Sequence, residues 1–348
     1  MPTATSRTAR AARILAVGIA AGLGIAMIWA NAISFDLEDW RTYLAAAERV
    51  ASGGPVYDWS TGAEHVYRYA PWFAYALVPF RALPPAIADA TWTAFVVAGV
   101  IAAVAPLVAH RTLAGIGLAL LAAGLLTRVA STGNVHPVLI AGLVLGLHTR
   151  AGPILIAAAA SLKAVPILFA AVYIAERRWT ALAVTLVVTA ILVAPMPWLG
   201  YELTPGPSES LFGISPLLWV IAALGSILVL GWLTLRRSPY VALAAGVAAY
   251  LALPRAFLYD ITLVLPGIAR SADPGGSSAR PQSEDALPHA DSVGDMDGDD
   301  RRHGEPHRVA GPATKEHGGK QQRKVEDDAG RQDHPDRRYD EADQGGAE

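Results

Sequence analysis

The sequence lacks cysteine altogether, which excludes disulfide bonds and thiolate metal sites. Charged residues are also scarce, at 17% of 348 residues, whereas hydrophobic residues reach 53%, a larger share than in average soluble domains. The formal net charge of −2 gives no sign of a highly charged partner, so we expect no nucleic-acid binding. No glycine-rich nucleotide fingerprint and no internal repeat occurs. We predict neither a metal ion nor a cofactor.

The few charges are distributed unevenly along the chain. Residues 14–268 consist of apolar runs broken by short polar loops, whereas residues 269–348 are rich in Asp, Gly, Arg, His and Pro. A segment with so few large apolar side chains cannot offset the entropy cost of ordering. We therefore predict a cytoplasmic N-terminus at 1–13, a transmembrane domain at 14–268 and a disordered hydrophilic tail at 269–348. The histidines of the tail are expected to be solvated rather than to bind metal.

The first apolar run spans residues 14–33 and follows three arginines, Arg7, Arg10 and Arg13. Its length matches the roughly 20 helical residues that cross the hydrocarbon core of a bilayer. A cleaved signal peptide is the alternative, but its apolar core usually has only about 7–15 residues, so we favour an anchor. Positive charges tend to stay in the cytoplasm. This predicts a cytoplasmic N-terminus and places the following loop, residues 34–71, outside.

Further apolar runs predict an all-α polytopic membrane protein with roughly 8–10 transmembrane or re-entrant helices. The run at 72–80 is too short to span a membrane and is expected to be re-entrant or interfacial. Basic residues that follow spans are expected in the cytoplasm, and the candidate polar sites outside. The remaining helices are expected at residues 86–109, 113–126, 138–147, 180–196, 217–235, 241–253 and 261–268.

The apolar run at 153–175 contains a lysine, Lys163, and a proline, Pro166. As a single helix, it would place the charged residues 176–178 outside, against the tendency of arginines to stay inside. A lysine in a membrane usually faces a cavity or a partner, and proline breaks helices. We therefore predict two short helices that meet near Lys163, with the lysine at the outer mouth.

The loop at 34–71 carries more acids, aromatics and glycines than the apolar sequence on either side. Two acids, Asp36 and Asp39, open it. Apolar residues then recur at three- and four-residue steps, which predicts a short amphipathic helix lying at the membrane interface. These residues are Trp40, Tyr43, Leu44, Ala47 and Val50. A polar segment held at a membrane surface by flanking spans is a suitable place for a catalytic site.

A series of short motifs also occurs in a fixed order. They are Asp39 with Tyr43, Gly53-Gly54 with Tyr57, Tyr69-Ala70-Pro71, Leu83-Pro84, Gly133-Asn134, Lys163 with Pro166, Arg177-Arg178, and Pro254 with Tyr259-Asp260. In order and spacing, these motifs resemble those of the actinobacterial polytopic mannosyltransferases of glycosyltransferase family 87, which belongs to the GT-C superfamily.

This resemblance implies a GT-C-like bundle in the plasma membrane. It also implies transfer of mannose from a polyprenyl-phosphate donor to a lipid-linked glycan acceptor on the extracytoplasmic face. The missing nucleotide fingerprint agrees with a lipid-phosphate donor. Transfer with inversion needs a base for the acceptor hydroxyl and positive charge beside the departing phosphate. Asp39 is the candidate base, and Asp36 is the second choice.

Three cations expected at the outer face are candidates for the donor phosphate: Lys163, Arg68 and Arg255. Lys163 leads, because a lysine within an apolar run is costly unless it is paired. Snorkelling to the interface is the alternative for the lysine, and contact with lipid headgroups is the alternative for the arginines.

The candidate substrate-binding residues are Tyr43, Tyr69, Asn134 and Asp260. Tyr43 and Tyr69 would stack on sugar or lipid, or serve only as interfacial aromatics. Asp260 would orient a cation, bind a sugar hydroxyl or form a structural salt bridge. His65 and His136 are expected to be polar groups of a loop or helix end rather than ligands.

Two other functions remain open. A transporter or lipid flippase would also contain an intramembrane lysine, but it needs charged groups at the membrane midplane, whereas the polar candidates here gather in outer loops. The second alternative is an inactive, truncated member of the same family, because its members carry further membrane helices where this chain turns polar. A reading frame shifted near residue 270 would produce such a tail, and hydrophobic helices encoded in another frame would support that hypothesis.

Overall fold

The computed structural model of the chain describes residues 4–61, 66–109, 111–202 and 211–271. These residues all belong to one compact unit, Met1–Glu284. Apart from residues 269–271, which continue a helix, the tail predicted at 269–348 lies outside the described residues. His65 lies outside them as well.

Every regular element among the described residues is a helix, which confirms an all-α polytopic membrane protein. Within the described ranges, five helices are long and apolar enough to cross a membrane, the fourth of them together with the residues after it up to Leu199. They are α1 (Ala4–Ala32), α4 (Pro85–Ala109), α5 (Leu113–Ser131), α9 (Trp179–Val193) and α11 (Pro216–Leu235). Large apolar side chains on these helices, such as Leu15, Ile191 and Leu228, are more than half exposed. Such a surface suits lipid rather than water.

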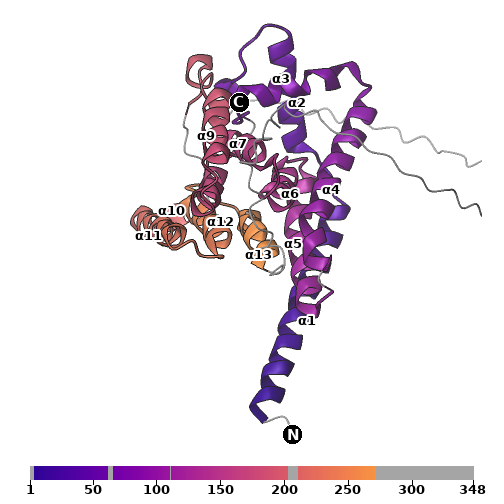
Figure 1. Ribbon diagram of the computed structural model, residues 1–348. Coiled ribbons are helices and arrows are strands. Elements are labelled where there is room, and N and C mark those ends of the chain that lie inside the picture. The colour runs from indigo at the N-terminus through magenta and orange to yellow at the C-terminus, as the bar shows by residue number, and fades with distance from the viewer. Residues whose placement is uncertain (1–3, 62–65, 110, 203–210, 272–348) are drawn as a thin grey trace, which may run out of the picture. The chain divides into compact units, whose positions relative to one another are not determined.

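Shorter helical segments complete the unit (Figure 1). They are α2 (Glu38–Ala51), α3 (Pro71–Leu77), α6 (His136–Gly146), α7 (Gly152–Leu162), α8 (Ala171–Ala175), α10 (Leu211–Ile214), α12 (Val241–Ala252) and α13 (Leu265–Ser271), with 3-10 helices η1 (Trp59–Thr61), η2 (Val78–Ala82), η3 (Val165–Ala170), η4 (Pro197–Leu199) and η5 (Leu258–Val264). The run at 72–80, expected to be too short for a span, forms α3 and η2.

The short helix expected at 138–147 is present as α6, which has 11 residues. At 1.5 Å per residue it is about 16 Å long, roughly half the thickness of the hydrocarbon core. Because α7 also has 11 residues and packs beside it, the two form a hairpin of half-length helices.

The helix α5 is longer than expected. The sequence predicts its end at Leu126, whereas the helix continues to Ser131. The hydroxyl groups of Thr127 and Ser131 do not stop the helix, because each of them donates a hydrogen bond to a backbone carbonyl of the same helix. Thr127 Oγ1 donates to the carbonyl of Ala123 at 2.7 Å, and Ser131 Oγ donates to that of Arg128 at 2.8 Å.

The predicted break at Lys163 is confirmed. The helix α7 ends at Leu162, and Lys163 leaves helical geometry with φ −141° and ψ 79°. Pro166 then lies in the first turn of η3, where a missing N–H costs little. The break leaves Lys163 at the turn between α7 and η3.

The helix α1 packs lengthwise against α5 (Figure 1). The two helices approach closely at two glycines: a Cβ added to Gly124 would lie 3.0 Å from the Cα of Gly24. Small residues allow membrane helices to approach this closely. This packing fixes the end of α1, and so the loop after it, against the end of α5.

The predicted amphipathic helix is present as α2, but its apolar face packs inside the protein instead of on a membrane surface. Trp40 and Tyr43 are at most 1% exposed. Trp40 stacks on Trp92 of α4 with ring centroids 4.5 Å apart, and its indole N–H donates to Asp89 at 2.9 Å. The helix is therefore rigidly held, together with Asp39, the residue before Trp40.

A second buried cluster joins α6, α7, α8 and α12, and it includes Ile156, Phe169 and Tyr173.

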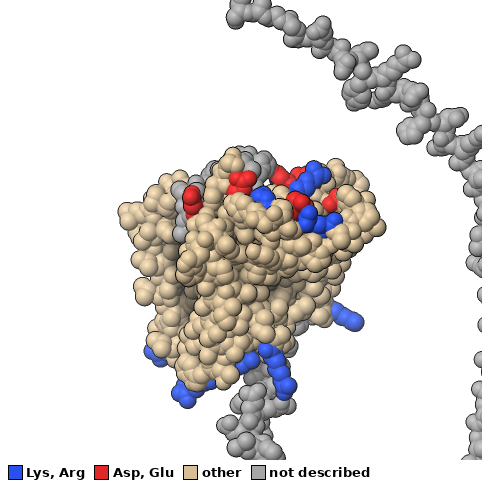
Figure 2. Space-filling model, turned by 90° about the horizontal axis from the view of Figure 1, so that it is seen from above, with Lys and Arg blue, Asp and Glu red and all other residues tan. Residues whose placement is uncertain are grey.

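Figure 2 shows a broad uncharged surface, with acids and bases mixed along one edge of the face and basic side chains near the opposite edge. Charges are costly in hydrocarbon, so this separation fits a protein whose uncharged band lies in a membrane.

Candidate functional site

The candidate site forms where the end of α5 meets the start of α2. The helix α5 ends in a Schellman motif, in which Gly133 N–H donates to the carbonyl of Ala130 at 2.9 Å and Asn134 N–H donates to that of Val129 at 3.1 Å. Gly133 has a φ of 74°, which glycine adopts without strain. The Gly-Asn pair noted in the sequence thus makes a turn that directs Asn134 toward α2.

The carbonyls of the same turn cap α2. Leu37 N–H donates to the carbonyl of Ser131 at 3.1 Å, and Asp39 N–H donates to that of Thr132 at 2.8 Å. The first N–H groups of a helix need such acceptors from outside the helix. This capping brings Asp39 beside Thr132 and Asn134, which are 93 and 95 residues away in sequence.

The carboxylate of Asp39 is held through one of its oxygens. Oδ2 accepts hydrogen bonds from Thr132 Oγ1 at 2.6 Å and from Asn134 Nδ2 at 3.0 Å. No residue in the described ranges donates to Oδ1, and the side chain is half-buried. One oxygen therefore fixes the orientation of the carboxylate, while the other is open to a ligand.

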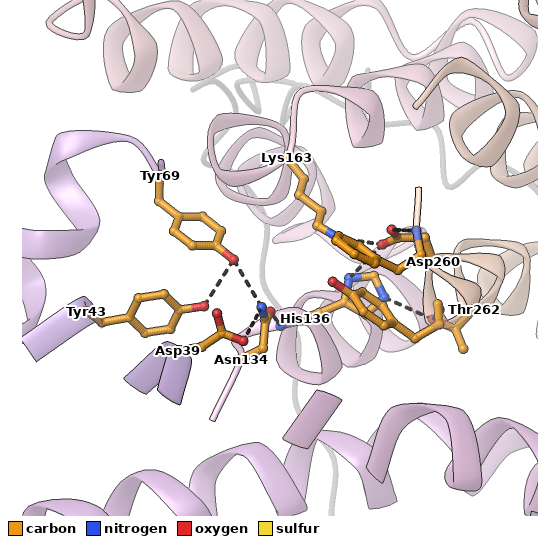
Figure 3. Close-up of polar contacts among 10 residues, drawn as sticks. Asp39, Tyr43, Tyr69, Asn134, His136, Lys163, Asp260 and Thr262 are labelled. Atoms are coloured by element: carbon orange, nitrogen blue, oxygen red, sulfur yellow. Dashed lines mark hydrogen bonds and ion pairs between the residues drawn. The ribbon is translucent and has the colours of Figure 1, made fainter. Parts of the chain in front are cut away.

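Two tyrosines extend this network (Figure 3). The hydroxyl of Tyr43 donates to that of Tyr69 at 3.0 Å, and Asn134 donates its second Nδ2 hydrogen to Tyr69 at 3.3 Å. Burial raises the pKa of both phenols, and the charge of Asp39 raises it further. Both tyrosines therefore stay protonated. Because Tyr69 accepts two hydrogen bonds here, its own hydrogen is available to a ligand.

A second group of residues lies on the other side of Asn134 (Figure 3). Lys163 forms an ion pair with Asp260, whose other oxygen accepts the N–H of Phe257 at 3.0 Å. The Asp260 side chain is fully buried, whereas that of Lys163 is 17% exposed. Asp260 thus orients the ammonium group and faces no open space. Of its three hydrogens, the ammonium group keeps two for other acceptors.

His136 connects the two groups. Its backbone N–H donates to Asn134 Oδ1 at 2.9 Å, and its side chain is only 1% exposed. Nε2 lies 3.0 Å from Thr262 Oγ1, which donates its own hydrogen to the carbonyl of Tyr259 at 2.7 Å. Nδ1 lies 3.9 Å from Asp260 Oδ1, and no described group hydrogen-bonds to it.

The remaining cations, Arg68 and Arg255, come from distant segments and are half-buried. Burial lowers the pKa of Arg68, and the charge of Arg255 lowers it further. Arg255 stands over the ring of Phe257, 5.4 Å from its centroid, and its Nε makes no hydrogen bond within the described ranges. Like charges held near each other favour an anionic ligand.

The phenol of Tyr259 is influenced by charges of both signs. Burial raises the pKa of its phenol, and the charges of Asp260 and Asp39 raise it as well, whereas that of Arg255 lowers it. The acid of α2 and the arginine before η5 therefore both lie within electrostatic reach of one phenol.

The structure separates the two candidate bases. Asp36 is exposed, and its Oδ1 accepts the N–H of Glu38 at 3.3 Å, so it serves the first turn of α2. Asp39 belongs to the network. The sequence-predicted residues that the hydrogen-bonded network and the ion pair bring together are Asp39, Tyr43, Tyr69, Asn134, Lys163 and Asp260.

Sequence reasoning missed Thr132 and Thr262, because isolated threonines in helix-end segments carry no distinguishing pattern. It considered His136 but interpreted it as a helix-end polar group. That position is correct, since α6 begins at His136, yet the side chain is buried in the site. The Asn-x-His spacing was the available signal, because an asparagine side chain often accepts the N–H two residues ahead.

The network offers a carboxylate that can accept a proton, a phenol that can donate a hydrogen bond and an ammonium group that can bind an anion. Such a set can take a proton from a hydroxyl while holding a phosphate. Within the described part of the chain, no three histidine or carboxylate side chains converge as metal ligands would.

Comparisons with known proteins assign the chain to no family: no family model, no curated protein and no solved structure matches it significantly.

Proposed function

We propose that the chain is a membrane glycosyltransferase of the GT-C type. It transfers mannose from a polyprenyl-phosphate donor to a lipid-linked glycan acceptor. The observation that carries this proposal is the open Oδ1 of Asp39, in one polar cluster with the ammonium group of Lys163. The donor and acceptor classes come from the resemblance of the motifs, and the roles of the residues come from the geometry.

Asp39 acts as the general base in this reaction. Its Oδ1 accepts the proton of the acceptor hydroxyl while the hydroxyl oxygen bonds to the anomeric carbon of mannose. The bond between that carbon and the phosphate oxygen breaks, and its electron pair leaves with the polyprenyl phosphate. Attack opposite the leaving group inverts the configuration. Thr132 and Asn134 hold the carboxylate in place, and Tyr69 donates its free hydrogen to a sugar hydroxyl.

The cations stabilise the departing phosphate. Lys163 contributes the ammonium hydrogens that Asp260 does not use, and Asp260 with His136 positions it. Arg68 and Arg255 add planar groups that match phosphate oxygens in pairs. Because negative charge grows on the phosphate during bond breaking, these contacts strengthen in the transition state.

We assign the site to the extracytoplasmic face of the cell membrane. Arginines lie within three residues of the ends of α4, α8 and α11, and such residues favour the cytoplasm; they are Arg111, Arg177, Arg178, Arg236 and Arg237. The half-length helix α6 begins in the site with His136 and ends two residues before His148, which lies near Glu176, next to Arg177. The site and Arg177 thus lie toward opposite ends of α6.

One observation favours a transporter as a second candidate. The Lys163–Asp260 pair and His136 form a largely buried group of ionisable residues, and such groups occur in coupled transport. A transporter would move a lipid-linked sugar across the bilayer without changing it chemically.

The test is sugar transfer in membranes that contain the full chain. The donor is radiolabelled polyprenyl-phosphate mannose, and the acceptor is a lipid extract from an actinobacterium. We expect a labelled glycolipid, and we expect a labelled sugar nucleotide not to replace the lipid donor. Product from the sugar nucleotide would contradict the donor class. Movement of labelled lipid across the bilayer without a new glycolipid would contradict the transferase and favour the transporter.

A further inference from the structure

A polar pocket lies at the opposite end of α12 from the segment that carries Asp260. It has a volume of about 310 Å³ and is lined by the charged residues Glu176, Arg237 and Arg270. Its floor includes Val241 at the start of α12, which is buried. The helix α12 runs from this pocket to Ala252, near the chain segment of the candidate site.

The carboxylate of Glu176 in this pocket is already paired with basic side chains. Arg270 Nη1 lies 2.9 Å from Glu176 Oε1, and His148 Nδ1 lies 3.5 Å from the same oxygen. Burial alone would raise the pKa of Glu176, but hydrogen bonds and the charges of His148 and Arg270 lower it to about 2. Arg270 uses Nη1 for these contacts, and no described residue takes the N–H groups on its Nη2 and Nε.

Arg237 adds a second positive charge, and no acid among the described residues pairs with it. It follows the end of α11 in a Schellman motif, in which its N–H donates to the carbonyl of Thr234 and Ser238 N–H donates to that of Leu233, both at 3.0 Å. Its φ is 51°, a conformation that suits glycine better than arginine. The two arginines and one carboxylate leave the pocket lining with a net charge of +1.

The pocket has the surroundings of a membrane–water interface. Trp232 and Tyr240, at the adjoining ends of α11 and α12, are each 57% exposed, and such aromatics are typical of the headgroup level. An apolar groove of about 420 Å³ runs between α11 and α12 and is lined by Leu233, Tyr240 and Leu243 among others. Residues 237–239 line the polar pocket, and the next residue, Tyr240, lines the apolar groove, so the two adjoin along the chain.

We propose that this pocket binds the phosphate headgroup of an anionic phospholipid, with an acyl chain of that lipid in the groove between α11 and α12. Arg237 and the free N–H groups of Arg270 contact the phosphate. Basic pockets between membrane helices bind anionic headgroups by this chemistry. The groove selects a lipid over free phosphate, because only a lipid also fills the apolar surface. This site is independent of the proposed transferase activity.

The variant that tests this site is Arg237→Gly, measured on the full chain in neutral detergent. It removes the side chain and also relieves the left-handed backbone, so the lipid-free protein should not lose stability. Arg177→Gly is the matched control, since Arg177 has a φ of 57° in an equivalent helix end and does not line the pocket.

The measurement is the thermal stabilisation produced by phosphatidylglycerol, by phosphatidylcholine and by inorganic phosphate. We expect phosphatidylglycerol alone to stabilise the wild type and Arg177→Gly, and to bind Arg237→Gly about fivefold more weakly. Equal affinity of phosphatidylglycerol for both variants would overturn the proposal. Stabilisation by inorganic phosphate to the same extent would overturn the assignment to a lipid.

Discussion

The side-chain amide of Asn134 donates a hydrogen bond of 3.0 Å to the carboxylate of Asp39, although 95 residues separate them in sequence. The same amide nitrogen donates to Tyr69, and the amide oxygen accepts the backbone N–H of His136. Because the backbone N–H fixes which end of the amide is oxygen, the nitrogen must face Asp39 and Tyr69. Asn134 therefore sets the geometry of the candidate base.

Replacing Asn134 with alanine tests this positioning. We expect sugar transfer to fall about 10- to 100-fold, because small displacements of a catalytic group cost this much. Asn31→Ala is the control, since Asn31 is also buried but donates only to the carbonyl of Met27 within α1. Transfer rates at equal amounts of protein in the membrane provide the comparison. A loss of similar size in both variants would point to a general folding defect.

The Lys163–Asp260 pair should respond strongly to removal of one partner. Asp260→Asn leaves the largely buried ammonium group without its counter-charge, and breaking such a pair costs about 3–5 kcal/mol. The double variant Lys163→Gln/Asp260→Asn removes both charges, and we expect it to recover much of this loss. Thermal unfolding in detergent micelles measures both.

A surface pair provides the control for this experiment. Glu48 bonds to Arg81 with their side chains 59% and 35% exposed, so Glu48→Gln should cost less than about 1 kcal/mol. A double variant at Lys163 and Asp260 that is no more stable than Asp260→Asn would argue against a charge-balanced pair.

Gly133→Ala tests the turn that carries Asn134. The positive φ alone costs an alanine about 1–2 kcal/mol, and the added Cβ would lie 2.6 Å from the Cβ of Trp40. Gly53→Ala separates these effects, because Gly53 has a φ of 77° and nothing within 4 Å of the added atom. We expect Gly133→Ala to be the less stable variant in thermal unfolding. Equal destabilisation would mean that α2 moves away at little cost.

Glu176 predicts a dependence of stability on pH. Its folded pKa of about 2 lies below the ordinary value of 4.5, so folding favours the ionised form. This stabilisation is fully present above about pH 4.5 and is lost as the pH falls toward 2. Glu176→Gln should lower the melting temperature at neutral pH, and the difference from wild type should shrink by about pH 3. A difference that stays constant over this range would contradict the assignment.

Hydrophobic periodicity located most helices, since residues 86–109, 217–235 and 241–253 match α4, α11 and α12 within one residue at each end. The break at Lys163 was also predictable, because a lysine and a proline close together in an apolar run rarely fit an unbroken membrane helix. The same reasoning cannot tell lipid from protein as the partner of an apolar face. For this reason α2 was expected on the membrane surface, although Trp40 and Tyr43 pack in the core.

The site was predictable only in part. Asp39, Asn134 and Lys163 were identified from motifs, but their contacts depend on the turn at Gly133, which joins segments remote in sequence. The motif already placed Asp39 ahead of Asp36, but the physical difference between them depends on that turn. Both acids lie in the same loop, and only the capping of α2 by the end of α5 determines which carboxylate meets Asn134.

The most direct test of the proposed catalysis compares sugar transfer by the wild type, Asp39→Asn and Asp36→Asn at equal membrane levels. Asparagine keeps the shape of the side chain but cannot accept the proton. We predict that Asp39→Asn lowers the rate by about 100-fold or more, while Asp36→Asn stays close to the wild type because Asp36 is exposed and outside the network. Equal transfer by the wild type and Asp39→Asn would contradict the role of Asp39 as the base.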